Sequence, residues 1–218
     1  MVRGLENLES IGFDLDGTLY PGTPEIDNRV RTQIAFRLLD KKPGLGNLDF
    51  AREFFEERYQ KLGSGTKVLS EAGYEDAGRV MDDCLVKADV LDLIKPNPKL
   101  AEIVCGIGKK LTIFLLTSSP ELLADQKLAR IGLKTRLFDY RFYGDNEGVG
   151  SKSNGDAFEK VLMETDSPAG NILYIGDRAK TDILPAKALG IKTCSVWREI
   201  PQADYHINNI NEIEDLVT

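Results

Sequence analysis

The feature that most constrains the fold is a near-continuous apolar run from Leu111 to Leu116, which ends abruptly in the polar segment Thr117-Ser118-Ser119-Pro120. A run without polar alternation suits a strand that is buried on both faces of a parallel sheet. Further strands are predicted at residues 11–13, 137–143, 171–175 and 191–197, with helices at residues 121–130, 156–163 and 181–189. This alternation predicts an α/β fold with a Rossmann-like, doubly wound parallel sheet.

The interval from Pro21 to Ile94 has a different pattern. It carries amphipathic helical spacing at residues 25–39, 49–62 and 77–93, and no convincing strand. We therefore expect a small helical domain at residues 21–94, inserted after the first strand, and a core domain formed by residues 1–20 and 95–218. The segment Lys95-Pro96-Asn97-Pro98 is the expected return hinge, because each proline biases the preceding residue away from helix. An alternative is that these helices pack on the sheet as ordinary crossover helices.

Composition excludes several classes of function. The 218 residues include 35 acidic and 28 basic side chains, and the net charge of -7 opposes binding to a nucleic acid polymer. No apolar run approaches the ~20 residues of a membrane span, and the first ten residues are no signal peptide. We expect a cytoplasmic protein without a membrane partner, and its oligomeric state stays unknown.

The chain contains three cysteines and one histidine. Cys84, Cys105 and Cys194 lie far apart in the sequence and are expected to be buried, unpaired thiols of a reducing compartment. His206 is the single histidine. Carboxylates are therefore expected to carry any acid and base chemistry.

Two carboxylates follow the first predicted strand, within the segment Asp14-Leu15-Asp16-Gly17-Thr18-Leu19-Tyr20. One carboxylate of such a pair can attack a substrate while the other exchanges a proton with the leaving group. Asp-x-Asp-Gly also occurs in tight turns and in calcium loops. A calcium loop is disfavoured because Leu19, Tyr20 and Pro21 follow the glycine where further oxygen ligands are needed.

Polar side chains also follow the other predicted strands. Thr117 and Ser118 follow the second strand, Lys152 the third, and Asp177 with Asp182 the fourth. Because the carboxyl ends of parallel strands share one edge of the sheet, these residues are expected to lie near Asp14 and Asp16. Alone, each has an ordinary explanation as a helix cap, a surface charge or a turn. Together they meet the needs of phosphoryl transfer: a nucleophile, a metal ion and donors to the phosphate oxygens.

In order and residue type, these motifs resemble the haloacid dehalogenase superfamily, specifically its magnesium-dependent phosphatase branch. The first motif is matched in full by Asp14 to Tyr20, the second by Thr117 and Ser118, the third by Lys152 and Phe158, and the fourth by Gly176, Asp177 and Asp182. Ser153 replaces the proline that usually follows the lysine of the third motif. The helical insertion resembles the family's small C1-type cap, and within the family the chain looks most like the pyrimidine 5′-nucleotidase type.

The resemblance implies a role for each matched residue. Asp14 is expected to attack phosphorus and form an aspartyl phosphate, and Asp16 to protonate the leaving oxygen and then activate water. Mg²⁺ is expected on the Asp14 carboxylate, the Asp16 backbone carbonyl, Asp177 and Asp182. Thr117, the backbone N–H of Ser118 and Lys152 are expected to bind the phosphoryl oxygens.

The resulting prediction is a Mg²⁺-dependent phosphomonoesterase that acts on small phosphorylated metabolites, with nucleoside 5′-monophosphates as the first candidates. Two alternatives stay open: a phosphomutase, which returns the phosphoryl group to a bound substrate, and a catalytically idle binding or regulatory protein on the same fold. The predicted cap also offers aromatic and basic side chains for contact with a base. These are Arg52, Phe54, Phe55, Arg58 and Tyr59, although an aromatic stripe at helical spacing is more typical of a core.

Overall fold

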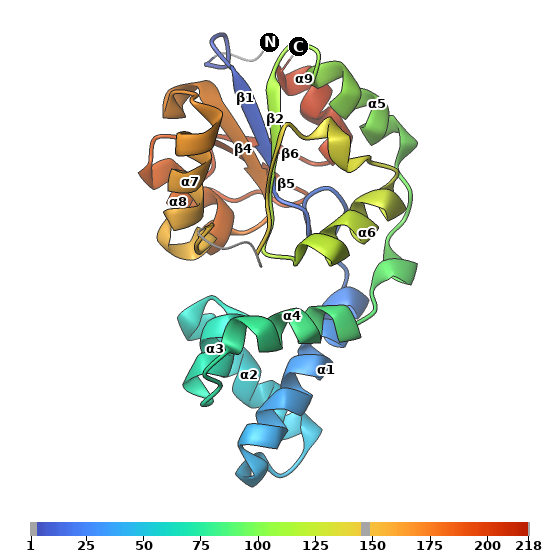
Figure 1. Cartoon of the computed structure of the whole chain (residues 1–218), viewed down its shortest axis with the longest axis vertical. Coiled ribbons are helices and arrows are strands. Elements are labelled where there is room, and N and C mark those ends of the chain that lie inside the picture. The colour runs from blue at the N-terminus through green and yellow to red at the C-terminus, as the bar shows by residue number, and fades with distance from the viewer. Residues whose placement is uncertain (1–3, 145–148, 218) are drawn as a thin grey trace. The chain divides into compact units, whose positions relative to one another are not determined.

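The computed structural model describes residues 4–144 and 149–217. The expected ends of the core domain, residues 1–3 and residue 218, lie outside these ranges. The chain forms two compact units: one consists of the residues up to Pro21 together with those from Ile94 onward, and the other spans Gly22–Leu93. Both are visible in Figure 1, where the second unit is drawn in light blue to green.

A single six-stranded parallel sheet forms the centre of the first unit. Its strands are β1 (Ser10–Phe13), β2 (Thr112–Leu116), β3 (Tyr140–Phe142), β4 (Ile172–Gly176), β5 (Lys192–Val196) and β6 (Tyr205–Ile207), in the order β3-β2-β1-β4-β5-β6. The prediction of a doubly wound α/β fold is confirmed. β1 and β4 are neighbours although they are distant in sequence, so the winding reverses between them, which is where such sheets bind ligands.

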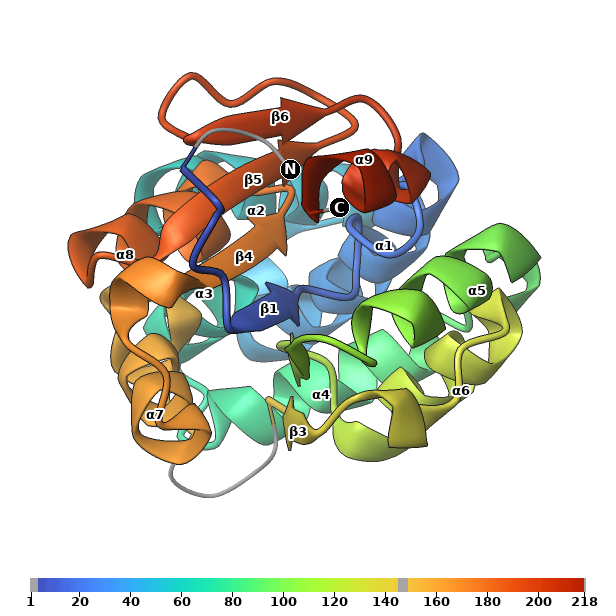
Figure 2. The same ribbon diagram turned by 90° about the horizontal axis from the view of Figure 1, so that it is seen from above.

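Helices cover both faces of this sheet. Figures 1 and 2 show α5 (Pro98–Ile107), α6 (Glu121–Ile131) and α9 (Ile213–Val217) on one face, with α7 (Asp156–Thr165) and α8 (Leu184–Ala188) on the other. α5 begins where Asn97 accepts a hydrogen bond from the N–H of Leu100, with Pro98 in the first turn. α6 ends at Gly132, which adopts the left-handed conformation that favours glycine. α5, α9 and β6 were not predicted.

Two predicted elements of the core have different boundaries. The strand expected at residues 137–143 is reduced to β3, because the N–H of Phe138 bonds back to the carbonyl of Thr135 and closes a 3₁₀ turn. The helix expected at residues 181–189 is a π-helical turn, Ala179–Ile183, followed by α8. Pro185 has no N–H to donate to the preceding turn, so a regular α-helix cannot continue through it.

Lys152 opens a short 3₁₀ turn (Lys152–Asn154) that precedes α7. Gly155 follows this turn with a positive φ of 98°, and α7 begins only at Asp156. This left-handed residue interrupts the helical path. The lysine is therefore presented from a turn rather than from the helix.

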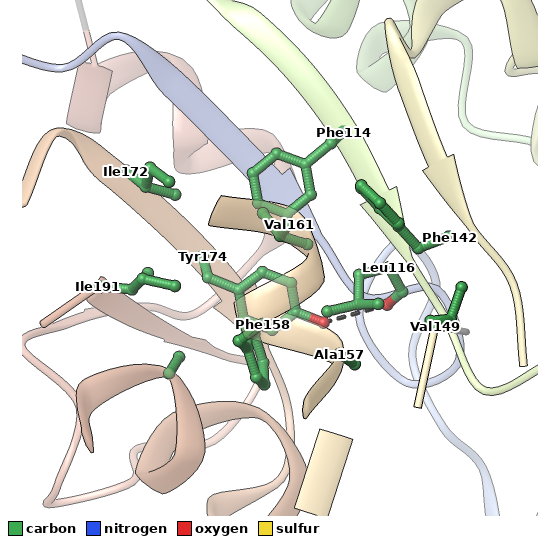
Figure 3. Close-up of a cluster of buried hydrophobic side chains, with 11 residues drawn as sticks. Phe114, Leu116, Phe142, Val149, Ala157, Phe158, Val161, Ile172, Tyr174 and Ile191 are labelled. Atoms are coloured by element: carbon green, nitrogen blue, oxygen red, sulfur yellow. Dashed lines mark hydrogen bonds between the residues drawn. The ribbon is translucent and has the colours of Figure 1, made fainter. Parts of the chain in front are cut away.

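The core beside the functional edge of the sheet is an aromatic cluster, shown in Figure 3. The rings of Phe114 and Tyr174 stack at 6.2 Å, and Phe158 packs edge-on against Tyr174 at 4.9 Å. The hydroxyl of Tyr174 donates a hydrogen bond to the carbonyl of Leu116 at 3.1 Å. A Cβ at Gly12 of β1 would lie 2.1 Å from the Phe114 ring, so glycine is needed for this packing.

The second unit is a separate bundle of helices with its own core. Its helices are α1 (Pro24–Lys41), α2 (Leu48–Leu62), α3 (Gly65–Glu71) and α4 (Ala77–Lys87). Their N-termini are capped by the side chains of Thr23, Asn47, Ser64 and Asp76. α3 was not predicted, and the helix expected to reach residue 93 ends at Lys87, with a 3₁₀ turn at Leu91–Leu93.

Three of the four aromatic side chains of α2 belong to the core of the second unit, whereas Phe50 is exposed. Phe55 is buried there, and Phe54 and Tyr59 pack against the same cluster. Arg58 lies over the ring of Phe54 and pairs with Glu71. The prediction that the aromatic stripe forms a core is confirmed.

Two further expectations concern thiols and membranes. Cys84 and Cys194 are buried, but Cys105 is exposed. The expectation for Cys105 is wrong because α5 buries the face that carries Leu100, Ile103, Val104 and Ile107, and the cysteine lies outside this stripe. Across the described ranges, no helix has the length and apolar character that crossing a membrane requires.

Candidate active site

Asp14 lies directly at the end of β1, beside β4. Its N–H donates to the carbonyl of Ile175 at 3.0 Å, which continues the pairing of the two strands and places the residue where the sheet reverses its winding. The side chain is buried. Thr18 Oγ1 donates to Asp14 Oδ2 at 3.2 Å, and Lys152 Nζ donates to Asp14 Oδ1 at 2.6 Å.

The turn after Asp14 is held by its glycine and by β5. Gly17 has a positive φ of 81°, and a Cβ at this position would lie 2.5 Å from Asp177 Oδ2. Only glycine allows this turn to approach Asp177 so closely. From the end of β5, Trp197 Nε1 donates to the carbonyl of Thr18 at 3.1 Å.

Asp16 is bound by three side chains. Its Oδ1 accepts from Lys127 Nζ at 2.5 Å and from the Tyr20 hydroxyl, and its Oδ2 accepts from Ser119 Oγ at 2.6 Å. Burial alone raises the pKa of Asp16, but Lys127 and the hydrogen bonds from Ser119 and Tyr20 outweigh burial and lower this pKa to about 2. The Asp16 carboxylate is therefore ionised in this arrangement.

Three carboxylates form a cluster that can hold a metal ion. One oxygen from each of Asp14, Asp177 and Asp182 lies within 4.8 Å of the others. Asp182 is fixed by the π-helical turn, where its Oδ2 accepts from the N–H of Arg178 at 3.0 Å. Asp177 Oδ1 is buried and has no hydrogen-bond partner among the residues that the structure describes.

Lys152 is the cation of this cluster. Its ammonium donates to Asp14 Oδ1 and Asp182 Oδ1, each at 2.6 Å, and to the hydroxyl of Tyr174 at 3.2 Å. Burial lowers the pKa of Lys152, but the two carboxylates outweigh it and hold the pKa well above its ordinary value. The lysine is charged at neutral pH.

Lys152 and Arg178, whose Nε lies 3.9 Å from Asp177 Oδ2, do not balance three carboxylates. Burial raises the pKa of Asp14 to about 7, and although Lys152 opposes this shift, Asp182 and Asp177 add to it. Burial likewise raises the pKa of Asp177 to about 6. Excess negative charge, oxygen donors and the unpartnered Asp177 Oδ1 together fit a small, hard divalent cation such as Mg²⁺.

The segment after β2 supplies hydroxyl groups. Thr117 is buried, its N–H donates to the carbonyl of Phe142, and its Oγ1 accepts from the N–H of Ser119 at 3.1 Å. The Thr117 hydroxyl therefore keeps its proton for another acceptor. Ser118 is exposed, and its predicted contact with a phosphoryl group stays a prediction.

The structure brings together four of the residues singled out from the sequence: Asp14, Lys152, Asp177 and Asp182. The carboxylate of Asp16 is turned to a different set of partners, and binding of metal by its backbone carbonyl stays a prediction. Sequence reasoning missed Ser119, Lys127 and Tyr174, which contact these acids or Lys152. Lys127 had a visible signal, a lysine at the buried helical spacing of Leu123, Leu128 and Ile131.

Comparison with protein families identifies the family to which this chain belongs. The model of the haloacid dehalogenase-like hydrolases matches residues 8–190, which include all of these acids and both lysines. The chain belongs to this family and is a hydrolase of its α/β fold.

Two individual proteins and one solved structure illustrate what this chain is similar to. The chain is 28% identical to a glyceraldehyde 3-phosphate phosphatase of Methanocaldococcus jannaschii, over 96% of this chain and 97% of the relative. It is 27% identical to a pyrimidine 5′-nucleotidase of Escherichia coli, over 58% of each protein. Among solved structures, a haloacid dehalogenase family phosphatase from Thermococcus onnurineus shares the fold with a TM-score of 0.65 and 19% identity, over 96% of this chain and 98% of that one.

Proposed function

We propose that this protein is a Mg²⁺-dependent phosphomonoesterase that acts on small phosphorylated metabolites through an aspartyl phosphate. The observation that carries the proposal is the Asp14 carboxylate, buried at the switch point of the sheet between Lys152 and the acid cluster. An acid in this position has the donors and the metal ligands that attack on a phosphate dianion needs.

In the first half of the reaction, a carboxylate oxygen of Asp14 forms a bond to phosphorus as the bond from phosphorus to the ester oxygen breaks. Thr18 and Lys152 hold the Asp14 carboxylate in place, and Lys152 offsets the charge of the phosphoryl oxygens. The Thr117 hydroxyl donates to one of those oxygens. Asp16, once it has taken up a proton from solvent, delivers that proton to the departing ester oxygen.

In the second half, a water oxygen bonds to phosphorus and the bond from phosphorus to Asp14 breaks. Asp16 accepts the proton of this water, which regenerates both acids and releases phosphate. The arrangement around Asp16 suits this base role directly, because its lowered pKa keeps it ionised. Protonation of the leaving group requires that Asp16 first receives a proton.

A divalent cation on Asp14, Asp177 and Asp182 supplies charge neutralisation between the nucleophile and the phosphate when it is bound. Lys152 has to share Asp14 and Asp182 with that cation. Asp177 Oδ1 has no hydrogen-bond partner in the described part of the chain and is open to the cation, whereas Oδ2 faces Arg178 Nε at 3.9 Å.

The substrate class is proposed from chemistry and from relatives together. The full-length relative is named for glyceraldehyde 3-phosphate and the partial one for pyrimidine nucleotides. We therefore place a triose phosphate first and pyrimidine nucleoside 5′-monophosphates second. The helical unit is proposed to act as the cap, which selects the leaving group and excludes water.

The test is turnover of a panel of phosphate monoesters with Mg²⁺, for the wild type, Asp14→Asn and the exposed control Asp215→Asn. Release of inorganic phosphate that is lost only in Asp14→Asn supports the proposal, because the amide keeps the size of the side chain but loses the nucleophile. Formation of an isomeric phosphate ester without free phosphate identifies a phosphomutase instead. Absence of turnover across the panel favours an idle binding protein.

A further inference from the structure

Within residues 4–144 and 149–217, two lysines are buried, and each is paired with one acid of the Asp-x-Asp segment. Lys152 donates to Asp14, the proposed nucleophile. Lys127 donates to Asp16, the proposed acid and base. Lys127 itself takes no part in the proposed bond-forming steps.

Lys127 occupies a position that helix packing alone would give to an apolar residue. It lies on the buried face of α6 together with Leu123, Ala124, Leu128 and Ile131, and only 2% of its side chain is exposed. Burying an ammonium costs several kcal/mol unless it is paired and hydrogen-bonded. The contacts of its ammonium with Asp16 and Ser119 offset this cost.

These contacts occupy both carboxylate oxygens of Asp16. Lys127 Nζ lies 2.5 Å from Asp16 Oδ1 and 2.9 Å from Ser119 Oγ, and Ser119 Oγ lies 2.6 Å from Asp16 Oδ2. The three groups form a closed triangle, and Tyr20 adds a further donor to Oδ1. The Asp16 side chain remains 34% exposed despite these contacts.

We propose that Lys127, together with Ser119, is a positioning residue for Asp16. It fixes the orientation of the carboxylate that exchanges protons with the leaving group and with water, and does not itself touch the substrate. This inference rests on the proposed function, because it assigns Lys127 a role only through the chemistry of Asp16.

A double-mutant cycle tests whether Lys127 acts through Asp16. The variants are Lys127→Met, Asp16→Asn and the double variant, with Lys160→Met of α7 as the control on an exposed helix face, all assayed with phenyl phosphate and saturating Mg²⁺. Lys127→Met should lower kcat/KM by on the order of tenfold, part of the roughly 10²–10⁴ that a positioned acid or base contributes. In the Asp16→Asn background, Lys127→Met should change kcat/KM less than about twofold, because the group that it positions is gone. Equal losses in the two backgrounds would show that Lys127 only supports the fold, and would overturn the inference.

The leaving group provides a second readout that a structural defect would not move. p-Nitrophenyl phosphate has nearly the shape of phenyl phosphate, but its leaving group departs as a stable anion and needs little protonation. Lys127→Met and Asp16→Asn should therefore both reduce kcat/KM more for phenyl phosphate than for p-nitrophenyl phosphate. Uniform losses on both esters, or a gain on phenyl phosphate, would also contradict a positioning role.

Two further variants keep the test decisive if Lys127→Met is poorly folded, as judged by circular dichroism and thermal unfolding. Ser119→Ala removes two of the three contacts of the triangle and should give the same leaving-group signature, by a fewfold. Lys127→Arg keeps the charge and should retain more activity than Lys127→Met. If Asp16→Asn itself leaves kcat/KM unchanged, the proposed function fails at Asp16. If Asp16→Asn is impaired and neither Ser119→Ala nor the lysine variants reproduce its signature, only the present inference fails.

Discussion

Replacement of Lys152 by methionine would remove the cation of the acid cluster while keeping most of the side-chain volume. The ammonium makes two ion pairs of 2.6 Å, with Asp14 and Asp182, and all three side chains are buried. Removing one partner of a buried ion pair costs about 3–5 kcal/mol, because the remaining charges are left uncompensated. For a chain of this size such a loss lowers Tm by about 10 °C.

The carboxylates determine how the loss of stability in Lys152→Met changes with pH. With Lys152 present, the pKa of Asp14 is already raised to about 7, and without the lysine it must rise further. At pH 5 protons can take the place of the ammonium, whereas at pH 8 the carboxylates repel one another. The difference in Tm between wild type and Lys152→Met should therefore be larger at pH 8 than at pH 5.

The assay is thermal unfolding at both pH values without metal, with Lys160→Met as the control, together with turnover of p-nitrophenyl phosphate with Mg²⁺. Lys160 forms a surface pair with Glu164, which contributes at most about 1 kcal/mol. Turnover of Lys152→Met should fall by on the order of a hundredfold or more, as for loss of one electrostatic stabiliser. A Tm difference that is the same at both pH values, or turnover within a fewfold of wild type, would refute the reasoning.

Three further outcomes are expected. Chelation of divalent metal should abolish turnover and lower Tm, and added Mg²⁺ should restore both. Ca²⁺ should restore Tm with little turnover, because it accepts a looser coordination shell. Activity in metal-free buffer would contradict the assignment of the acid cluster as a metal site. Burial raises the pKa of the Cys84 thiol to about 11 and that of Cys194 to about 12, so only the exposed Cys105 should react with a thiol reagent at pH 8, counted by mass spectrometry. Tyr174→Phe should lower the free energy of unfolding by about 1–3 kcal/mol, measured with denaturant, since it leaves the Leu116 carbonyl without its donor; an unchanged midpoint would argue against this bond.

The fold was predictable where strands are long, apolar and followed by polar residues. The run before Thr117 and the segment before Asp14 both form central strands, β2 and β1. The edge strand β6 has no such signal. It has three residues, one of them His206, and it forms where β5 offers a parallel partner. Helical periodicity also does not distinguish the π-helical turn at Ala179–Ile183, which carries Asp182 toward Lys152, from an ordinary α-helix.

The site was predictable only as far as its position at one edge of the sheet. Strand ends bring Asp14 and Asp177 together, so their proximity follows from topology. The partners of Asp16 do not follow from topology, because Lys127 comes from the interior of a helix and its buried ammonium contradicts simple helical amphipathicity. The sequence does show a charged residue, Lys127, on the apolar face of a helix. Its role can be inferred only when the structure shows that it pairs with Asp16.

The first unit is interrupted between Pro21 and Ile94, where the helical bundle is inserted. This interruption affects which exchanges of chain segments the fold tolerates. A connection between β1 and β2 that the helical bundle makes roughly fourfold longer costs only about 1 kcal/mol of additional loop-closure entropy. The bundle has its own core and local contacts, so it does not have to be built on the sheet. β1, in contrast, gains its neighbours β2 and β4 only after about half and then most of the chain has been synthesised. Whole modules can thus be exchanged at this junction with little loss of stability, whereas Asp14, the proposed nucleophile, reaches its position only when β4 has joined the sheet.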